Sequence, residues 1–229
     1  MKRLAAVWGI LMMTFPVQAG PDNDAENMFS EGRLQYTVEM GPVERNTRSK
    51  EPGGKGTFVI YMKYGKCRVE MKMNNGFMYT LLYDLNGDGA ISLVKNGTDN
   101  YALKLTDLEY KRQNFNDTEH KTTLTGETDT LAGMPVKKAE VDASQVRHIS
   151  VWYAPDRPVT SPRFFNMFPG INPLPGIPVR YESRDMGSNA QLVLTLDTLE
   201  VKPIDSRMFD VPRGYALITM DKYKSILKK

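Results

Sequence analysis

The sequence has few of the side chains that disulfides, metal centres and many catalytic sites require. Its single cysteine, Cys67, excludes an intramolecular disulfide, and a chain of 229 residues can bury about 70% of its unfolded surface without one. Its two histidines, His120 and His148, are too few and too isolated for a zinc or catalytic centre. We therefore expect a fold held by its own hydrophobic core, with no cofactor.

Long hydrophobic runs are also missing, except at the N-terminus. Two basic residues precede an apolar stretch from Leu4 to Phe15, and Val17-Gln18-Ala19 has the small-residue pattern of a cleavage site. The stretch is shorter than the roughly 20 residues that span a bilayer, so it predicts no transmembrane anchor. We expect residues 1–19 to be a secretory signal peptide, cleaved near Ala19-Gly20. Residues 20–229 would then form a single domain in a bacterial periplasm or outside the cell.

An excess of charge of one sign is absent as well. Two of the 30 basic residues lie in the expected signal peptide, and the other 28 face 27 acidic residues. Proteins that bind nucleic acid show a clustered basic face, which this balance does not predict. The lysines of the tail Asp221–Lys229 favour a solvated chain end over contact with anionic lipid head groups.

Apolar and polar residues alternate along much of the first half of the chain. From Cys67 to Met73 the odd positions are apolar and the even positions are charged, which is typical of an antiparallel strand with one wet face. Phe58–Tyr64 and Phe77–Tyr83 repeat the pattern, and short links rich in Asn-Gly and Asp-Gly suit tight hairpins. We predict a meander of at least five strands between Gly54 and Leu105.

The second half predicts further strands and few helices. The apolar positions of its last strand change phase, so we expect a β-bulge near Asp197-Thr198 that returns both sets to the core. Short helices are expected at Asp22–Phe29, Pro162–Met167 and Ser206–Phe209. The pattern predicts a mainly β fold, in which a strongly curved antiparallel sheet forms a half-barrel or incomplete barrel. Such a sheet has a concave apolar face, which a helix, the proline-rich loop Trp152–Glu182 or a ligand must cover. The expected strands are Lys121–Thr125, Met134–Val141, Arg147–Tyr153, Ile177–Ser183 and Gln191–Val201.

The segment Trp152–Glu182 combines seven of the fourteen prolines with large apolar side chains. Proline fixes φ and lacks a backbone donor, so the segment is predicted to be neither an interior helix nor a central strand. Disorder is not favoured, because Phe164, Phe165, Met167 and Phe168 would remain in water. We interpret the segment as an ordered, apolar-lined lid or binding loop. The alternative is a crossover that only plugs the open end of the sheet.

One acidic turn resembles a metal site. Asp84–Gly89 matches the opening of a calcium loop, with oxygen ligands at its first, third and fifth positions and glycine at its sixth. The twelfth position requires a glutamate and holds Lys95, and alternating strands flank the loop where an EF-hand has helices. A hairpin turn is the favoured interpretation.

A group of methionines offers soft metal ligands. Met71 and Met73 share a strand face with Cys67, and Met62 and Met78 belong to the neighbouring strands, a set that would suit copper(I). Methionine more often fills irregular cores or lines adaptable apolar cavities, and that interpretation is favoured.

No arrangement of catalytic residues is evident. The sequence lacks a G-x-S-x-G motif, and its serine, histidine and aspartate residues show no recognisable triad. Asp156 and Asp185 flank the proline-rich segment and could pair, but acidic residues beside a loop are more often solvated. Cys67 lies within a predicted strand, on its apolar face, where a thiol is normally buried and inert. We predict that the protein is not an enzyme.

Several short motifs suggest a family. Val151-Trp152-Tyr153-Ala154 ends a strand, and Phe168-Pro169-Gly170 and Leu174-Pro175-Gly176-Ile177 follow it. With Thr125-Gly126-Glu127-Thr128 upstream and Met208–Tyr215 near the end, they resemble uncharacterised bacterial secreted proteins named for a Gly-Leu-Pro-Gly-Leu-Ile motif. The pattern equally resembles the related outer-membrane lipoprotein carriers, the LolA-like half-barrels.

The resemblance implies a curved sheet around an apolar cavity and a cell-envelope role, in Bacteroidetes-type bacteria, with no catalytic set. The chain departs from the motif at Pro173, which replaces its first glycine, and at Pro178, which replaces its final isoleucine. Because Pro178 cannot donate to a ladder, we expect the strand to begin after it.

Two functions from different classes remain. The first is a non-enzymatic periplasmic binding or carrier protein for a lipid, acyl chain or lipoprotein, since each buried methylene contributes about 0.8 kcal/mol. The second is an interaction or structural module of the cell envelope, with a self-filled core and a proline-rich loop that binds a partner protein. A secreted enzyme would require a cleft with polar groups of perturbed pKa. The expected ligand contacts, in cavity and lid, are Phe58, Ile60, Met62, Val69, Met71, Leu81, Trp152, Phe164, Phe165 and Phe168.

Overall fold

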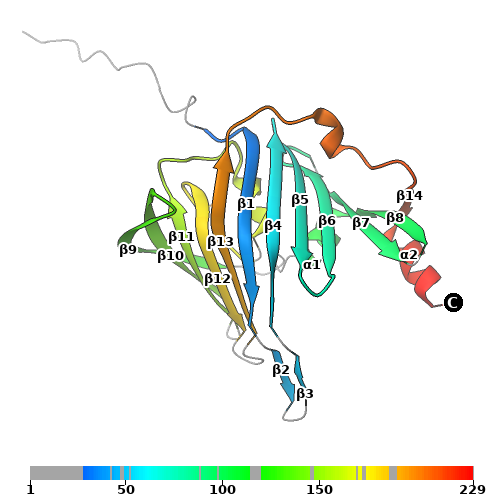
Figure 1. Ribbon diagram of the computed structural model, residues 1–229, viewed down its shortest axis with the longest axis horizontal. Helices are drawn as coiled ribbons and strands as arrows, with labels where there is room; N and C mark the ends of the chain where they lie inside the picture. The colour runs from blue at the N-terminus through cyan, green and yellow to red at the C-terminus, as the bar shows by residue number, and fades with distance from the viewer. Residues whose placement is uncertain are drawn as a thin grey trace, which may run out of the picture.

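A computed structural model shows that β-strands make up most of the residues that it describes (Figure 1). It describes residues 28–41, 43–46, 49–51, 53–87, 89–96, 98–113, 120–144, 147–168, 170–171, 174–185 and 190–228. The strands are β1 (Glu31–Met40), β2 (Val43–Asn46), β3 (Ser49–Glu51), β4 (Gly54–Lys63), β5 (Lys66–Met73), β6 (Met78–Asp84), β7 (Ala90–Asn96), β8 (Asp99–Leu105), β9 (Lys121–Leu131), β10 (Met134–Ser144), β11 (Arg147–Ala154), β12 (Ile177–Asp185), β13 (Gln191–Glu200) and β14 (Ala216–Thr219). The helices are α1 (Asp107–Gln113), the 3₁₀ helices η1 (Pro162–Met167) and η2 (Ser206–Phe209), and α2 (Met220–Leu227).

Twelve of the strands form one curved sheet, in the order β14-β8-β7-β6-β5-β4-β1-β13-β12-β11-β10-β9. Neighbouring strands are antiparallel, except for the parallel pair β14 and β8. Within the described part of the chain the end strands β9 and β14 do not pair with each other, so the sheet is an open half-barrel. The predicted mainly β, half-barrel fold is confirmed. So are the five-strand meander from Gly54 to Leu105 and the five strands of the second half.

Strand β1 lies at the centre of the sheet, between β4 and β13 (Figure 1). Its alternate residues Leu34, Tyr36 and Val38 are completely buried. They define the inner face, which the two wings of the sheet curve around. This strand was not predicted from the sequence, although its apolar residues recur with the same period of two as those of the predicted strands.

The predicted bulge in β13 is present. Gln35 of β1 pairs with Thr198, whereas Tyr36 pairs with Leu196, so Asp197 is the extra residue. The bulge was expected to return the later apolar residues of this strand to the core, but it does not do so for all of them. Val201 lies beyond the strand end with 75% of its surface exposed.

The start of β12 corrects a prediction about proline. The strand begins at Ile177, before Pro178, and Pro178 pairs with Tyr153 beside a register shift in β11 and β12. A bulge tolerates the missing donor, and the Pro178 carbonyl accepts a hydrogen bond of 2.9 Å from the buried Tyr36 hydroxyl. Because β12 lies between β11 and β13, the prediction that no part of Trp152–Glu182 enters a central strand is wrong for its last residues.

The segment from residue 201 to residue 215 crosses the outer face and is tied to it by backbone contacts. The Glu31 carboxylate accepts from the Ile204 amide at 2.8 Å, and the Lys63 ammonium donates to the Ile204 carbonyl at 2.6 Å. The amide contact and the nearby Lys63 ammonium hold the pKa of Glu31 below its usual value. Further along, Val211 and Tyr215 cover a small outer core made by Leu82, Leu93 and Ala102.

Two of the three predicted helices are present, as η1 and η2. The third, Asp22–Phe29, lies almost wholly outside the described residues, as do the expected signal peptide 1–19 and its cleavage site at Ala19-Gly20. Among the described helices, none has the length and apolar character needed to cross a membrane.

Candidate functional site

The inner face is covered by the loop that connects β11 to β12. Ser161 caps η1 by accepting a hydrogen bond from the Arg163 amide, and Pro162 occupies the first turn, where its missing donor is harmless. The helix directs Phe164, Phe165 and Met167 into the core, followed by Phe168. The loop therefore closes over the concave face with its own aromatic side chains.

Phe168 occupies the centre of this aromatic cluster. Its ring centroid lies 5.8 Å from that of Tyr36, 6.3 Å from Phe58, 6.0 Å from Phe164 and 6.0 Å from Tyr181. Such separations are typical of favourable edge and tilted aromatic packing. Packed in this way, the loop fills the concave face as a plug would. A plug was the alternative to a lid in the interpretation of the sequence.

Most of the predicted ligand contacts meet on the inner face, within this packed core. Met71 is only partly buried, and Trp152 lies on the outer face, in register with Lys138, whose ammonium is 5.8 Å from the indole centroid. Strand parity explains this, since the neighbours Val151 and Tyr153 both point inward. The contacts with at most 4% of their surface exposed are Phe58, Ile60, Met62, Val69, Leu81, Phe164, Phe165 and Phe168.

The sheet opens between β6 and β7. These strands pair only where Thr80–Tyr83 faces Ala90–Leu93. On its other side β6 stays paired with β5 down to Met78, and β7 stays paired with β8 up to Asn96. The two strands thus diverge, and each presents an edge without ladder partners to the gap. We call this opening the seam.

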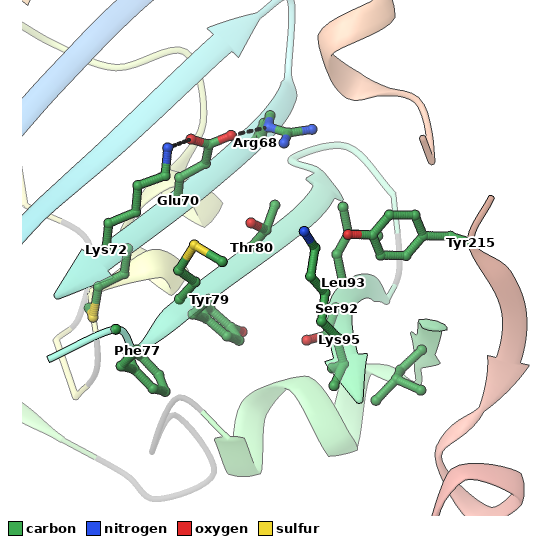
Figure 2. A pocket seen from close by; sticks show the side chains of 15 residues that line it. Arg68, Glu70, Lys72, Phe77, Tyr79, Thr80, Ser92, Leu93, Lys95 and Tyr215 are labelled. Atoms are coloured by element: carbon green, nitrogen blue, oxygen red, sulfur yellow. Dashed lines mark hydrogen bonds and ion pairs between the residues drawn. The ribbon is translucent and has the colours of Figure 1, made fainter. Parts of the chain in front are cut away.

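A cleft of about 910 Å³ lies at the seam (Figure 2). Because it crosses the sheet, both faces contribute to its walls. Phe77 and Met78 stand at its mouth with 52% and 58% of their surfaces exposed. The inner-face residues that line it are Met71, Tyr79, Ser92, Val94 and Leu103, and those from the outer face include Arg68, Glu70, Lys72, Thr80, Lys95 and Tyr215.

Positive charge predominates on the outer side of the cleft. Glu70 accepts a contact of 2.7 Å from Arg68 and lies 3.5 Å from the Lys72 ammonium (Figure 2). Lys95 has no acidic partner among the residues that the structure describes. Deeper in the cleft, Ser92 has only 4% of its surface exposed, and its hydroxyl makes no hydrogen bond to any described residue. On its outer side the cleft therefore has one carboxylate facing three cations.

The buried tyrosines should make the folded protein less stable at alkaline pH. Desolvation raises the pKa of Tyr79, in the wall of the cleft, from 10.0 to about 12, and it also raises the pKa of Tyr36 and Tyr110. Above pH 10 the unfolded chain loses these protons while the folded chain keeps them. The contribution of these tyrosines to stability should therefore be constant below about pH 10 and then fall by about 1.4 kcal/mol per pH unit for each tyrosine, until the pH reaches its pKa in the folded protein.

Urea unfolding between pH 8 and pH 12 measures this effect. Tyr79→Phe should flatten the alkaline slope between pH 10 and pH 12, whereas Tyr64→Phe, at a side chain with 71% of its surface exposed, should leave it unchanged. An identical slope in Tyr79→Phe and the parent protein would contradict the assignment of Tyr79 to a desolvated site.

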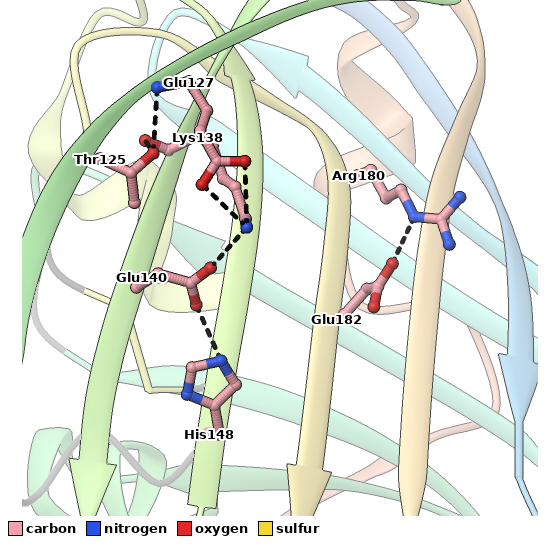
Figure 3. A network of polar contacts seen from close by, with 7 residues as sticks. All are labelled: Thr125, Glu127, Lys138, Glu140, His148, Arg180 and Glu182. Carbon is pink, nitrogen blue, oxygen red and sulfur yellow. Dashed lines mark hydrogen bonds and ion pairs between the residues drawn. The ribbon is translucent and has the colours of Figure 1, made fainter.

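A second group of polar side chains lies on the outer face of β9, β10 and β11 (Figure 3). The Lys138 ammonium contacts Glu127 at 3.2 Å and Glu140 at 3.0 Å, which raises the pKa of Lys138. His148 contacts the other oxygen of Glu140 at 2.8 Å. These side chains are partly exposed and lie on a wet face, where ion pairs of this kind contribute little to stability.

The two aspartates that flank the proline-rich segment do not meet. Asp185 pairs with Arg147 at the start of β11, whereas Asp156 follows the end of that strand at Ala154. The length of β11, roughly 25 Å for eight residues at 3.3 Å each, separates them. Their suggested pairing is therefore wrong.

The methionines that were considered as soft-metal ligands, with core or cavity lining as the favoured interpretation, do not all share one face of the sheet. Met78 pairs with Lys72 and shares its outer face, whereas Met71 and Met73 belong to the inner face. Cys67 is buried, and desolvation raises the pKa of its thiol, so the prediction of an inert core thiol is confirmed.

The acidic motif at Asp84 is a hairpin turn between β6 and β7, as favoured. The Asp84 side chain accepts a hydrogen bond of 2.8 Å from the Asn86 amide, and the Gly87 amide donates to the Asp84 carbonyl at 3.2 Å. Asp88 lies outside the described residues.

Comparison with known proteins supports the fold. No family model matches the chain, and no curated protein matches it, so the resemblance to the Gly-Leu-Pro-Gly-Leu-Ile proteins gains no support. A solved structure of an uncharacterised conserved protein from Thermus thermophilus is similar, with a TM-score of 0.52 and 9% identity. The match covers 86% of this chain and 95% of the other. At that identity, the likeness shows a shared fold and nothing about activity.

Weaker likenesses extend to two further solved structures. One is the MucA/MucB complex of Pseudomonas aeruginosa, with a TM-score of 0.40 and 12% identity, covering 82% of this chain and 59% of the other. The other is a putative outer membrane lipoprotein-sorting protein domain from Vibrio parahaemolyticus, with a TM-score of 0.35 and 9% identity, covering 90% and 95%. Neither is close enough to indicate what this chain binds.

Proposed function

We propose that the chain is a non-enzymatic periplasmic binding or carrier protein for a molecule with a long acyl chain, such as a lipid or a lipoprotein acyl group. The observation that carries the proposal is the cleft at the seam. Its volume of about 910 Å³ lies within the usual range of ligand sites. Exposed Phe77 and Met78 at its mouth have the apolar character that normally marks a binding surface. The proposed compartment is supported by the secretory pattern of residues 1–19.

The energetics favour an acyl chain over a small polar molecule. Each methylene transferred from water into an apolar wall contributes about 0.8 kcal/mol, so about ten buried methylenes contribute about 8 kcal/mol before the cost of association. Flexible methionines at Met71 and Met78 would let the walls adapt to chains of different length. No strong polar contact is needed for retention.

The predicted ligand contacts on the inner face are not accessible to a ligand in the structure, in contrast to the cleft. Phe58 and its neighbours are sealed by Phe164, Phe165 and Phe168, so they would meet a ligand only after the loop from residue 155 to residue 176 moves away. The cleft, in contrast, is open in the structure as it stands. Binding at the seam is therefore the simpler route.

Mass spectrometry of the purified protein tests the proposal. Residues 20–229 would be exported to a bacterial periplasm, purified without detergent, and weighed under native and denaturing conditions. We expect a mass excess that denaturation removes and that solvent extraction recovers as lipid. A clean mass, with no lipid taken up after incubation with phospholipid vesicles, would reject the carrier function.

The self-filled inner face favours one alternative, a cell-envelope interaction module. In that case the aromatic plug would be permanent, and the exposed part of the loop around Arg157 and Arg163 would face a partner protein. The same mass measurement separates the two functions, since such a module would carry no lipid.

A further inference from the structure

We infer that the seam between β6 and β7 is a binding site that crosses the sheet and takes a single-chain amphiphile with an anionic head group. The head group would lie at the outer face, and the chain would pass through the sheet to the inner side. This inference rests on the proposed function and adds to it the position of the site and the charge of its ligand.

The walls of the cleft change character from one face of the sheet to the other. On the inner side, Met71, Tyr79, Val94 and Leu103 provide an apolar surface next to the main core. On the outer side the side chains at Arg68, Lys72 and Lys95 are cationic. A molecule that matches both sides must carry an apolar chain at one end and a compact charge at the other.

The sign of that charge follows from the ion pairs. Glu70 is the acidic residue in the lining, and it already contacts both Arg68 and Lys72. Lys95 keeps an uncompensated positive charge within the described structure. A carboxylate, sulfate or phosphate at the outer mouth would meet this charge, whereas a cationic head group would be repelled.

Polar groups inside the cleft also lack partners. The Ser92 hydroxyl makes no hydrogen bond to any described residue, and the edges of β6 at Tyr79 and β7 at Val94 have no ladder partner across the seam. A ligand in the cleft can therefore meet the backbone groups at these open strand edges without breaking a ladder.

Titration calorimetry with three probes of equal chain length tests the site. The probes are dodecanoate, dodecanol and dodecyltrimethylammonium, each below its micelle concentration, added to delipidated residues 20–229. Dodecanoate should bind about tenfold more tightly than dodecyltrimethylammonium, with dodecanol between them. Equal affinity for the anionic and cationic probes would overturn the assigned head-group charge.

Two pairs of variants locate the binding. Lys95→Glu should weaken dodecanoate about tenfold and leave dodecanol unchanged, whereas Lys121→Glu, an exposed lysine on the distant β9, should change neither. Val94→Asp should weaken all three probes, whereas Val201→Asp, at a residue with 75% of its surface exposed, should weaken none. Circular dichroism and unfolding curves would confirm that each variant is folded.

The outcomes separate this inference from the proposed function. Unchanged binding in both Lys95→Glu and Val94→Asp, with lipid still present in native mass spectra, would place the site elsewhere and leave the carrier function standing. If Val94→Asp did not fold, the Lys95→Glu pair alone would decide, because that side chain is exposed. Absence of lipid and of binding by all three probes would reject both.

Discussion

Phe168→Ala should lower the free energy of unfolding by about 3–5 kcal/mol, the range for removing a fully buried phenylalanine. The side chain has no exposed surface and contacts aromatic rings contributed by β1, β4, η1 and β12. Alanine would leave a cavity where the loop from residue 155 to residue 176 and both wings of the sheet meet. Urea unfolding monitored by circular dichroism measures the loss.

Phe77→Ala is the matched control, because it removes the same ring from a position with 52% of its surface exposed. It should change stability by about 0.5 kcal/mol or less. The comparison also decides between plug and lid. A loop that opens to admit ligand would tolerate Phe168→Ala with little loss of stability and would show altered lipid retention instead.

Antiparallel structure could be predicted from the sequence wherever alternation and turn chemistry agree. Strands β5 and β6 show a period of two, and glycine turns at Gly65 and Gly76 adopt the positive φ that their hairpins require. Strand β1 has the same alternation at Leu34, Tyr36 and Val38. It lacks a tight turn on either side that would mark its ends, since Ser30 precedes it and the β2–β3 hairpin follows.

The candidate site could be predicted only in part. Trp152 was among the expected contacts, although the alternation of Val151 and Tyr153 already places it on the opposite face. The plug could not be separated from a lid, because buried aromatic residues in a proline-rich loop suit both. The structure adds that the loop is closed around Phe168, with aromatic rings at 5.8 and 6.0 Å, and the stability of Phe168→Ala then decides between the two.

The seam had no local signal. Strand β6 repeats large apolar residues at every second position from Tyr79 to Tyr83, and β7 is apolar at four of its first five positions, but nothing in either sequence states how far the ladder between them extends. Its length depends on the twist of the whole sheet and on neighbours that are distant in sequence. Met71, at the edge of this opening, was nevertheless among the predicted contacts, because its strand face was identified correctly.

Gly176, in the motif Leu174-Pro175-Gly176-Ile177, is required by close backbone packing, and this gives the glycine a structural reason that involves no ligand. The residue lies between Pro175 and the first residue of β12, where the chain returns beneath the end of β11. A Cβ atom at this position would lie 1.9 Å from the Ala154 carbonyl oxygen and 2.9 Å from the Cα of Pro155. Both obstacles are backbone atoms in the tightest part of the crossover, so no side chain can rotate to make room.

Gly176→Ala should therefore destabilise the protein by about 3 kcal/mol or more, through separation of β11 from β12 at the point where the plug leaves the sheet. Gly54→Ala is the matched control, since its Cβ would meet only the flexible end of Met73, at 3.3 Å, and should be neutral or slightly stabilising. Thermal unfolding of both variants measures the difference. Equal melting temperatures would show that the backbone at Ala154 can shift freely, and that the crossover does not fix the plug. A large loss in Gly176→Ala alone would mean that the Leu174-Pro175-Gly176-Ile177 turn fixes the start of β12, and with it the end of the aromatic loop, against the end of β11.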